Sequence, residues 1–344
     1  MKMRSTLQRT LQALCMTGLS ILGFVPAHAA DPVQVTADNY VRAESDFQMR
    51  GYIENFDCFG KLYHSRKPYD VNNQVTVRGN RDTLYSFGVF DLTSPLTITL
   101  PETDGRYQSL MVVNQDHSLA AAYSPTTVTL TEDKVGTRFA LLTIRTFMDP
   151  NDEKDMKAAH RLQDAVKVKQ ADIGKFEAPN WKKEEVEQMR ETINVVAATV
   201  TDSSKIFGRK EELDPVYWML GAALGWGGLP AKAATYVNVF PEKNDGKTAY
   251  TLTVKDVPVD AFWSVTLYDD KGWMPVNEYN AYSFNNVTAK KSEDGSITIH
   301  FGGDPAQPNF LPIVTGWNYI VRLYQPKKAI LDGSWTFPDP EPVE

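Results

Sequence analysis

The sequence predicts a mainly β protein in which two antiparallel β modules, each a sandwich of the jelly-roll-like kind, are joined by an α-helical segment. Three observations support this fold class. Segments such as Leu96–Leu100 strictly alternate apolar and polar residues, as half-buried antiparallel strands do. Turn residues separate these segments, and no helical pattern lies between them within either half. The middle of the chain, residues 149–230, instead has apolar residues at helical spacing.

The first module is expected over residues 31–148. A short helix is predicted near Tyr40–Met49, and Ser94 with Pro95 marks a chain reversal between the first two strands. The predicted strands of this module are Thr83–Phe90, Leu96–Leu100, Tyr107–Asn114, Val128–Leu130 and Phe139–Phe147.

The central segment, 149–230, is expected to contain three helices. The first opens at the D-P-N sequence that begins at residue 149 and runs through Val168, and the second covers residues 181–200. The third starts at Asp214, which serves as an N-cap before a proline at the first helical position, and ends near Gly225.

The second module is expected over residues 231–344. Asp-Gly and Asp-Lys-Gly turns separate its strands. The predicted strands are Ala249–Val254, Phe262–Tyr268, Ser296–Phe301 and Trp317–Leu323.

Residues 1–30 have the order of a secretory signal peptide. Basic residues precede an apolar run, Leu11–Val25, and the sequence A-H-A ends at Ala29. We expect cleavage near Ala29 or Ala30. The apolar run is too short for a membrane anchor, so the protein is predicted to be periplasmic or secreted, with no membrane anchor.

The composition excludes some classes of partner. Removal of the first thirty residues, which carry three basic and no acidic side chains, changes the net charge from −7 to −10. Such an acidic chain does not suit nucleic acid, whose phosphates require clustered Lys and Arg. The processed chain keeps only Cys58, so no internal disulfide is possible. Cys58 lies among aromatic residues and is predicted to be a buried core thiol rather than a catalytic one.

Several local signatures of enzymes and cofactor sites are absent. The sequence has no G-x-S-x-G, G-x-x-x-x-G-K, H-E-x-x-H or C-x-x-C pattern. Four histidines follow the signal segment without the spacing of a shared metal site: they are His64, His117, His160 and His300. We therefore predict no metal site and leave the cofactor unspecified.

Two short polar groups are candidates for chemistry. At the end of a predicted strand, Asn114 precedes Asp116 and His117, a carboxylate beside an imidazole that suits acid-base work. The alternative, favoured here, is that these loop residues bond backbone amides after the strand.

The second candidate group is the segment R-G-N-R-D-T-L-Y-S-F, residues 78–87. In a functional interpretation, the planar guanidinium of Arg81 binds an anion through two parallel N–H groups, and Asp82 acts as a base. Asn80 and Tyr85 are then ligand contacts. Structurally, Asn80 and Asp82 would bond backbone amides in a turn that starts a strand, and this interpretation is the favoured one.

A third possibility is a carbohydrate site built from aromatic residues beside carboxylates. Aromatic faces stack on the apolar faces of sugars while carboxylates bind hydroxyls, although aromatic residues on strands are usually core. The aromatic candidates are Trp226, Trp263, Tyr268, Trp273, Tyr279 and Tyr282, with Trp226 as the predicted ligand contact.

These segments resemble a pair of bacterial domains of unknown function, numbered 1254 and 1214. The resemblance to the first rests on R-G-N-R-D-T-L-Y-S-F-G-V-F-D-L from residue 78, G-R-Y-Q-S-L from 105, V-N-Q-D-H from 113 and V-G-T-R-F from 135. The resemblance to the second rests on V-D-A-F-W-S-V-T-L-Y-D from 259, D-G-S-I-T-I from 294 and R-L-Y-Q-P-K-K-A-I-L-D-G-S-W from 322. The resemblance implies an exported protein with jelly-roll-like β domains, in a compact form that is shorter than many relatives. It does not indicate a reaction or a catalytic residue.

Two hypotheses about function follow, and whether the protein is an enzyme stays open. In the first, it is a hydrolase of a glycan or ester in the envelope or environment, with Asp82, Asp116 and His117 as catalytic residues and Arg81 as an anion clamp; these four must then converge on one pocket. In the second, it is a non-catalytic module that binds a carbohydrate or other small molecule, or assembles into a homo-oligomer.

Overall fold

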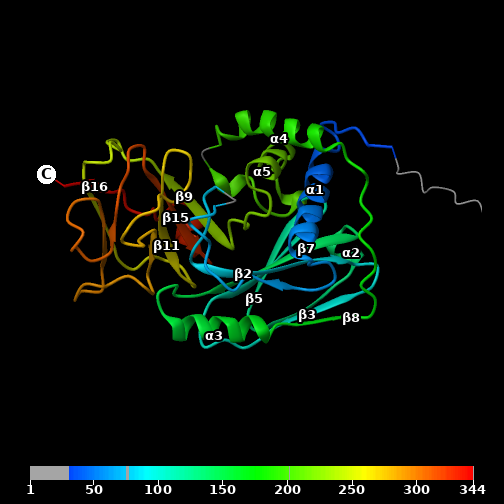
Figure 1. The fold of residues 1–344 in the computed structure, drawn as a ribbon, viewed down its shortest axis with the longest axis horizontal. Helices are drawn as coiled ribbons and strands as arrows, with labels where there is room; N and C mark the ends of the chain where they lie inside the picture. The colour runs from blue at the N-terminus through cyan, green and yellow to red at the C-terminus, as the bar shows by residue number, and fades with distance from the viewer. Residues whose placement is uncertain (1–30, 75–76, 201, 344) are drawn as a thin grey trace, which may run out of the picture. The chain divides into compact units, whose positions relative to one another are not determined.

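A computed structural model describes residues 31–74, 77–200 and 202–343 (Figure 1). The predicted signal peptide falls on residues 1–30 and lies outside this part. The chain from Pro32 onward forms one compact unit. It is mainly β, with antiparallel sheets and a few helices, as the sequence predicts.

The first module contains two sheets. The strand order is β1-β2-β7-β4-β5 in the five-stranded sheet and β6-β3-β8 in the three-stranded one, and all neighbours are antiparallel. The two sheets share a hydrophobic cluster that includes Phe90, Leu142 and Ile98. The strands are β1 Tyr63–His64, β2 Thr83–Asp91, β3 Leu96–Leu100, β4 Gln108–Asn114, β5 Leu119–Tyr123, β6 Thr126–Leu130, β7 Phe139–Phe147 and β8 Lys167–Gln170.

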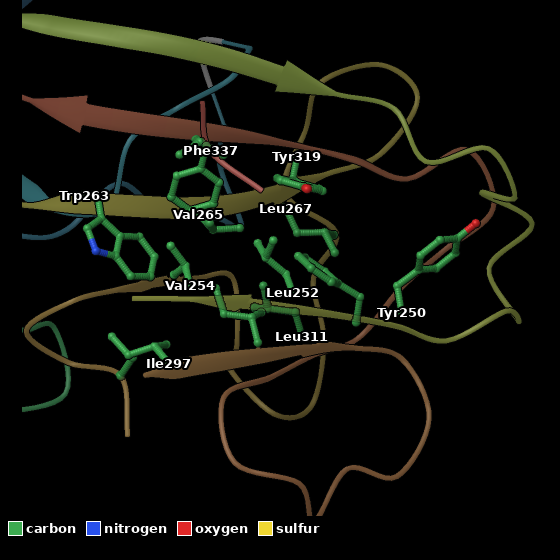
Figure 2. Packing of buried hydrophobic residues seen from close by; sticks show 14 of the residues in the cluster. Tyr250, Leu252, Val254, Trp263, Val265, Leu267, Ile297, Leu311, Tyr319 and Phe337 are labelled. Atoms are coloured by element: carbon green, nitrogen blue, oxygen red, sulfur yellow. The ribbon is translucent and has the colours of Figure 1, made fainter. Parts of the chain in front are cut away.

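The second module also contains two sheets that share a hydrophobic cluster. The strand orders are β12-β11-β15-β9 and β14-β13-β10-β16, and only β13 and β14 pair in parallel. Figure 2 shows Leu252 and Leu311 from one sheet facing Val265 and Leu267 from the other. The strands are β9 Ala234–Val239, β10 Tyr250–Val254, β11 Trp263–Tyr268, β12 Ser283–Asn285, β13 Ile297–Phe301, β14 Phe310–Leu311, β15 Asn318–Tyr324 and β16 Glu341–Pro342.

Three of the helices pack together. Apolar residues of α1, α4 and α5, among them Tyr40, Val186 and Leu220, form a cluster of their own, and Figure 1 shows these helices beside the five-stranded sheet. As predicted, Asp214 caps α5 by accepting hydrogen bonds from two backbone N–H groups. The helices are α1 Tyr40–Phe56, α2 Glu132–Val135, α3 Glu153–Asp164, α4 Lys183–Ala197, α5 Pro215–Gly225 and α6 Lys328–Leu331, with 3₁₀ turns at Ser203–Lys205 and Lys210–Glu212.

The central segment is not helical throughout. The helix predicted through Val168 ends at Asp164, and Lys167–Gln170 forms strand β8, which pairs with β3 in the first module. The sequence K-V-K-Q is too short to establish a period of two, so its partner strand decides its conformation. Six further strands were not predicted: β1, β5, β9, β12, β14 and β16. Of these, β5 (L-A-A-A-Y) lacks an alternation of apolar and polar residues, and β1, β12, β14 and β16 are only two or three residues long.

The two modules also share a core. The face of the five-stranded sheet that carries Phe139 and Phe147 packs against Phe262 and Tyr324 of the second module. Cys58 lies fully buried in this cluster, as predicted, and burial raises the pKa of its thiol to about 11. Within the described ranges no helix is long and apolar enough to cross a membrane.

Close backbone packing at Gly88 makes a test of the fold. A Cβ atom here would overlap the carbonyl oxygen of Lys61, so we expect Gly88→Ala to lower the free energy of unfolding by about 1–3 kcal/mol. A Cβ atom at Gly51 in α1 would instead point into open space. The control Gly51→Ala should therefore raise stability by up to about 1 kcal/mol. Urea denaturation measures both, and equal effects would contradict the packing argument.

Candidate functional site

Asn80 has a structural role in the loop that leads into β2. Its side-chain oxygen accepts a hydrogen bond from the backbone N–H of Asp82 at 2.8 Å. Its amide nitrogen donates to the hydroxyls of Tyr324 at 2.9 Å and Tyr85 at 3.3 Å. Asn80 therefore closes the turn and also ties the first module to β15.

Asp82 follows in this loop and is 1% exposed. One carboxyl oxygen, Oδ2, accepts a hydrogen bond from the Ser264 hydroxyl at 2.6 Å. The other, Oδ1, has no hydrogen-bond donor among the residues that the structure describes. Burial raises the pKa of the Asp82 carboxyl, and the nearby Arg322 guanidinium and the Ser264 hydroxyl oppose that shift only in part. The Asn285 amide lies close enough to oppose it as well.

The hydrogen bond of the Arg81 side chain goes to a neighbouring loop and not to the backbone of its own turn. Its Nη1 donates to the carbonyl oxygen of Tyr69 at 2.8 Å, and the guanidinium lies 5.1 Å from the centre of the Tyr282 ring. Burial lowers the pKa of Arg81 from its usual value, but a guanidinium stays protonated.

A small pocket opens beside these residues. We call it the Asp82 pocket; its volume is about 190 Å³ and it lies where the two modules meet. The first module contributes Asp82 and Arg81, and the loop that contains β12 contributes the opposite wall. The lining residues are Arg81, Asp82, Asp149, Pro150, Asn151, Ser283, Phe284, Asn285 and Thr288.

Tyr85 lies further along β2 and contacts a buried arginine. The Arg145 guanidinium is 5.3 Å from the centre of the Tyr85 ring. Burial alone would raise the pKa of the Tyr85 phenol, but Arg145 and the Asn80 amide outweigh it and lower that pKa. Tyr85 thus belongs to the polar interior between the modules, and it does not line the Asp82 pocket.

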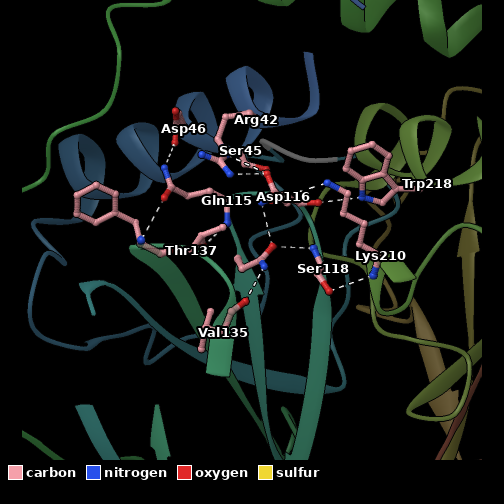
Figure 3. Close-up of polar contacts among 12 residues, drawn as sticks. Arg42, Ser45, Asp46, Gln115, Asp116, Ser118, Val135, Thr137, Lys210 and Trp218 are labelled. Atoms are coloured by element: carbon pink, nitrogen blue, oxygen red, sulfur yellow. Dashed lines mark hydrogen bonds and ion pairs between the residues drawn. The ribbon is translucent and has the colours of Figure 1, made fainter. Parts of the chain in front are cut away.

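The predicted group that contains Asn114, Asp116 and His117 forms the turn after β4 (Figure 3). Asn114 accepts hydrogen bonds from the backbone N–H groups of Asp116 and Ser118 at 2.9 Å and donates to the carbonyl oxygen of Val135 at 2.7 Å. The Asp116 carboxylate pairs with Arg42 of α1 at 2.6 Å. Asn114 therefore stabilises the turn, and Asp116 links the turn to helix α1.

His117 is buried in the same turn, 1% exposed. Its Nε2 accepts a hydrogen bond from the backbone N–H of Gly227 at 2.9 Å, and the ring stacks on Trp226 with centroids 6.0 Å apart. Trp226 in turn donates its indole N–H to the Ser45 hydroxyl at 2.9 Å. Burial lowers the pKa of His117 to about 3, so the ring is neutral at pH 7.

The two predicted groups do not meet. Thr83, next to Asp82, pairs with Phe147, whereas Asn114 pairs with Ala140, seven residues away along β7. At about 3.3 Å per residue this places the groups roughly 23 Å apart, at opposite ends of the sheet. The structure therefore does not assemble Arg81, Asp82, Asp116 and His117 around one pocket.

A larger pocket lies beside the Asp82 pocket. We call it the Tyr107 pocket; its volume is about 480 Å³. The half-buried rings of Tyr107 and Tyr123 lie 6.2 Å apart in it, and Tyr107 also contacts Phe262 at 5.4 Å. The lining residues are Thr103, Asp104, Gly105, Arg106, Tyr107, Gln108, Tyr123, Ser124, Phe147, Asp155, Asp260, Ala261, Phe262, Val287 and Gln325.

The sequence did not predict a site at the Tyr107 pocket. Tyr107 lies in the G-R-Y-Q-S-L motif, but its sequence neighbours do not distinguish a half-buried tyrosine in a pocket from a tyrosine in the core. Of the aromatic residues proposed for sugar binding, Trp263, Tyr268 and Tyr282 are core residues instead. No group of three or more metal-binding side chains occurs in the part of the chain that the structure describes.

The fold and the pockets define a mainly β protein of two modules with cavities at their junction. Two family models match it: Protein of unknown function (DUF1254) over residues 59–134 and Protein of unknown function (DUF1214) over residues 234–328. The two matches lie one in each half of the chain, in the paired arrangement that the sequence motifs indicate.

Two solved structures are similar to this chain. The VPA0106 protein from Vibrio parahaemolyticus has 20% identity and a TM-score of 0.66, and the match covers 89% of this chain and 98% of that one. A putative uncharacterized protein from Burkholderia cenocepacia has 16% identity and a TM-score of 0.50, with 89% and 87% covered. At these identities the likeness shows the fold alone. No curated protein matches the chain.

The buried neutral His117 predicts a pH dependence of stability. Its pKa is about 3 in the folded state and about 6.5 in an unfolded chain. Between these values the unfolded state binds the additional proton, so stability is lost as the pH falls below 6.5, by at most about 1.4 kcal/mol per pH unit. Asparagine tolerates the positive φ of 52° at this position.

We therefore expect His117→Asn to show a shallower loss of stability between pH 7 and pH 5 than the unsubstituted protein. Denaturant unfolding at both pH values measures this. Equal slopes would show that His117 does not titrate as a buried neutral ring.

Proposed function

We propose that the protein binds a carbohydrate, without catalysis, in the Tyr107 pocket. The observation that carries this proposal is a cavity of about 480 Å³ in which two neighbouring tyrosine rings lie beside carboxylates. Its volume lies in the range of about 300–1,000 Å³ typical of small-molecule sites. Domain junctions are also where such sites are common.

The chemistry of the lining supports a hydroxylated ring as the ligand. The half-buried rings of Tyr107 and Tyr123 line the pocket, and tyrosine rings can stack on the apolar face of a sugar. Asp104 and Asp260 are exposed carboxylates that line the pocket, in longer ion pairs with Arg106 at 3.5 Å and Lys327 at 3.4 Å. Their remaining lone pairs can accept hydrogen bonds from hydroxyls. Asp155 is already held by a bidentate pair with Arg106 at 2.6 and 2.8 Å, so it shapes the pocket and does not bind the ligand.

We also propose that the protein is exported and that each module is a jelly-roll-like sandwich. The signal-like residues 1–30 favour a periplasmic or secreted protein that meets glycans of the envelope or environment. The facing sheets in each module favour a jelly-roll-like sandwich. The hydrolase hypothesis has less support, because Asp82 lies at one end of the sheet while Asp116 and His117 lie at the other.

Binding is tested with an oligosaccharide array, followed by calorimetry on the strongest binder. Tyr123→Ala removes one stacking face from the half-buried floor of the pocket, and we expect an affinity loss of about tenfold or more, corresponding to at least about 1.4 kcal/mol. The control is Tyr279→Ala, at a tyrosine that is 47% exposed and packs on Phe310 outside both pockets. It should leave affinity unchanged. Absence of oligosaccharide binding, or equal losses in both variants, would contradict the proposal.

A further inference from the structure

Arg145 in β7 is buried, 8% exposed, in the polar interior between the two modules. Its one hydrogen bond to a described residue is weak and runs from Nη1 to Met111 Sγ at 3.9 Å. Burial disfavours the charge of Arg145, and the groups that oppose this most are phenols, with no carboxylate among them. These phenols belong to Tyr85, Tyr236, Tyr107 and Tyr324. Arg145 thus carries a charge that no ion pair within the described ranges balances.

Arg322, the other buried arginine in the described part of the chain, shows what a guanidinium at this depth requires. It donates to four oxygen atoms, two of them carbonyl oxygens of the loop before β2. Buried charges need such partners, because the loss of water without replacement costs free energy. For Arg145 only the Tyr85 hydroxyl lies close enough to act on the guanidinium. Its remaining acceptors must therefore come from water or from a ligand.

The free edge of Arg145 is the edge that binds carboxylates elsewhere in this protein. Its Nε and Nη2 atoms make no hydrogen bond of normal geometry with the described residues. Neither is among the described atoms that lack both a partner and contact with water, so both are accessible to water. In Arg138 the same two atoms donate to Asp91 at 3.1 and 2.8 Å, and in Arg190 they donate to Glu44 at 3.0 and 2.9 Å. Two parallel N–H groups match a planar carboxylate.

The charges of this interior also favour an anion. Its buried charged side chains are Arg145, Arg322 and Asp82. They sum to a charge of +1 when Asp82 is ionised and to +2 when it is protonated. Both guanidiniums act on the Tyr85 phenol: burial alone would raise its pKa, but Arg145, the Asn80 amide and Arg322 together lower it. A ligand with one negative charge would balance the excess.

We propose that the Nε and Nη2 edge of Arg145 is a binding site for the carboxylate group of a small organic acid. The Tyr85 hydroxyl is a further donor, because it accepts from the Asn80 amide at 3.3 Å and its own proton has no acceptor among the described residues. The rings of Tyr85 and Tyr236 remain partly accessible, so they can contact the apolar part of the acid. Arg145 lines neither of the two cavities described above, so this site does not depend on carbohydrate binding.

The test uses acetate as the probe, with acetamide as a neutral probe of the same shape and inorganic phosphate as an anion of higher charge, at matched ionic strength. Calorimetry and ligand-observed NMR measure binding to the full chain. We expect acetate to bind at one site and acetamide not to bind. Equal binding of acetate and acetamide, or no saturable binding of acetate at millimolar concentration, would overturn the proposal, the latter because water alone would then satisfy Arg145. Tighter binding of phosphate than of acetate would overturn the assignment to a carboxylate.

Two variants test the role of the guanidinium directly. Arg145→Lys keeps the charge but not the two parallel N–H groups, so acetate affinity should fall by about tenfold or more. Arg145→Met removes the charge and should abolish acetate binding while the protein still folds, since an apolar residue of similar size can replace a buried charge.

The matched control is Arg50→Lys. The Arg50 guanidinium also lies over an aromatic ring, 5.4 Å from the centre of Phe176, but it is half-buried and acts on the Asp46 carboxyl. Its substitution should leave acetate affinity unchanged. Equal losses in Arg145→Lys and Arg50→Lys, or no loss in Arg145→Lys, would overturn the assignment.

The ionisation of Tyr85 gives a measurement on the unsubstituted protein, which remains informative if the Arg145 variants fold poorly. A carboxylate bound to Arg145 offsets the positive charge that lowers the pKa of Tyr85, so saturating acetate should move this ionisation to higher pH. The charged and titratable groups that face Tyr85 are Arg145 from β7, Arg322 and Tyr324 from β15, Tyr236 from β9 and Tyr52 from α1.

Ultraviolet difference spectra of the tyrosinate form measure this shift, with Tyr85→Phe as the reference that lacks the titrating group. Tyr85→Phe also removes one donor to the ligand, so acetate affinity should fall by about threefold to tenfold in this variant. An unshifted titration in saturating acetate would overturn the proposal. Ionisation of Tyr85 already at pH 7 would overturn it as well, because the tyrosinate itself would then balance the charge of Arg145.

Discussion

The buried guanidinium of Arg322 is the interaction on which the arrangement of the two modules depends. Arg322 is 4% exposed in β15. It donates to the carbonyl oxygen of Arg78 at 2.9 Å and of Gly79 at 3.3 Å, to the Tyr268 hydroxyl at 2.7 Å and to the Thr266 hydroxyl at 2.9 Å. A buried cation without such partners would cost several kcal/mol. The chain can therefore bury Arg322 only when the loop before β2 lies against the second module.

This constraint places the residues of the candidate site. The loop that Arg322 holds continues into Asn80, whose amide reaches Tyr324 in the same strand, and into Asp82, whose carboxyl reaches Ser264 in β11. Both cavities lie along the resulting junction and draw lining residues from both modules. A chain with only one of the two family domains would lack a wall of each cavity, which gives a physical reason for their pairing in one chain.

The sequence predicted what depends on local chemistry. The alternation in Leu96–Leu100, the N-cap at Asp214 and the backbone bond of Asn80 are each determined by residues close in the chain. It did not predict the distance between Asp82 and His117, because that depends on the pairing register of β2, β7 and β4. It also could not show that Ser283–Asn285 faces Asp82, since about two hundred residues separate them and only the packing of the modules brings them together.

Asp82 and His117 show why an unsatisfied buried atom is not by itself a sign of function. The Nδ1 atom of His117 also has no partner among the described residues. Yet the ring packs between Trp226 and Phe207 and lines neither of the two cavities described above. Its low pKa keeps it neutral, which limits the cost to that of one unpaired N–H. Asp82 has a similar deficit at one oxygen, and there the Ser264 hydroxyl and the nearby Arg322 guanidinium offset part of the cost of burying the carboxyl.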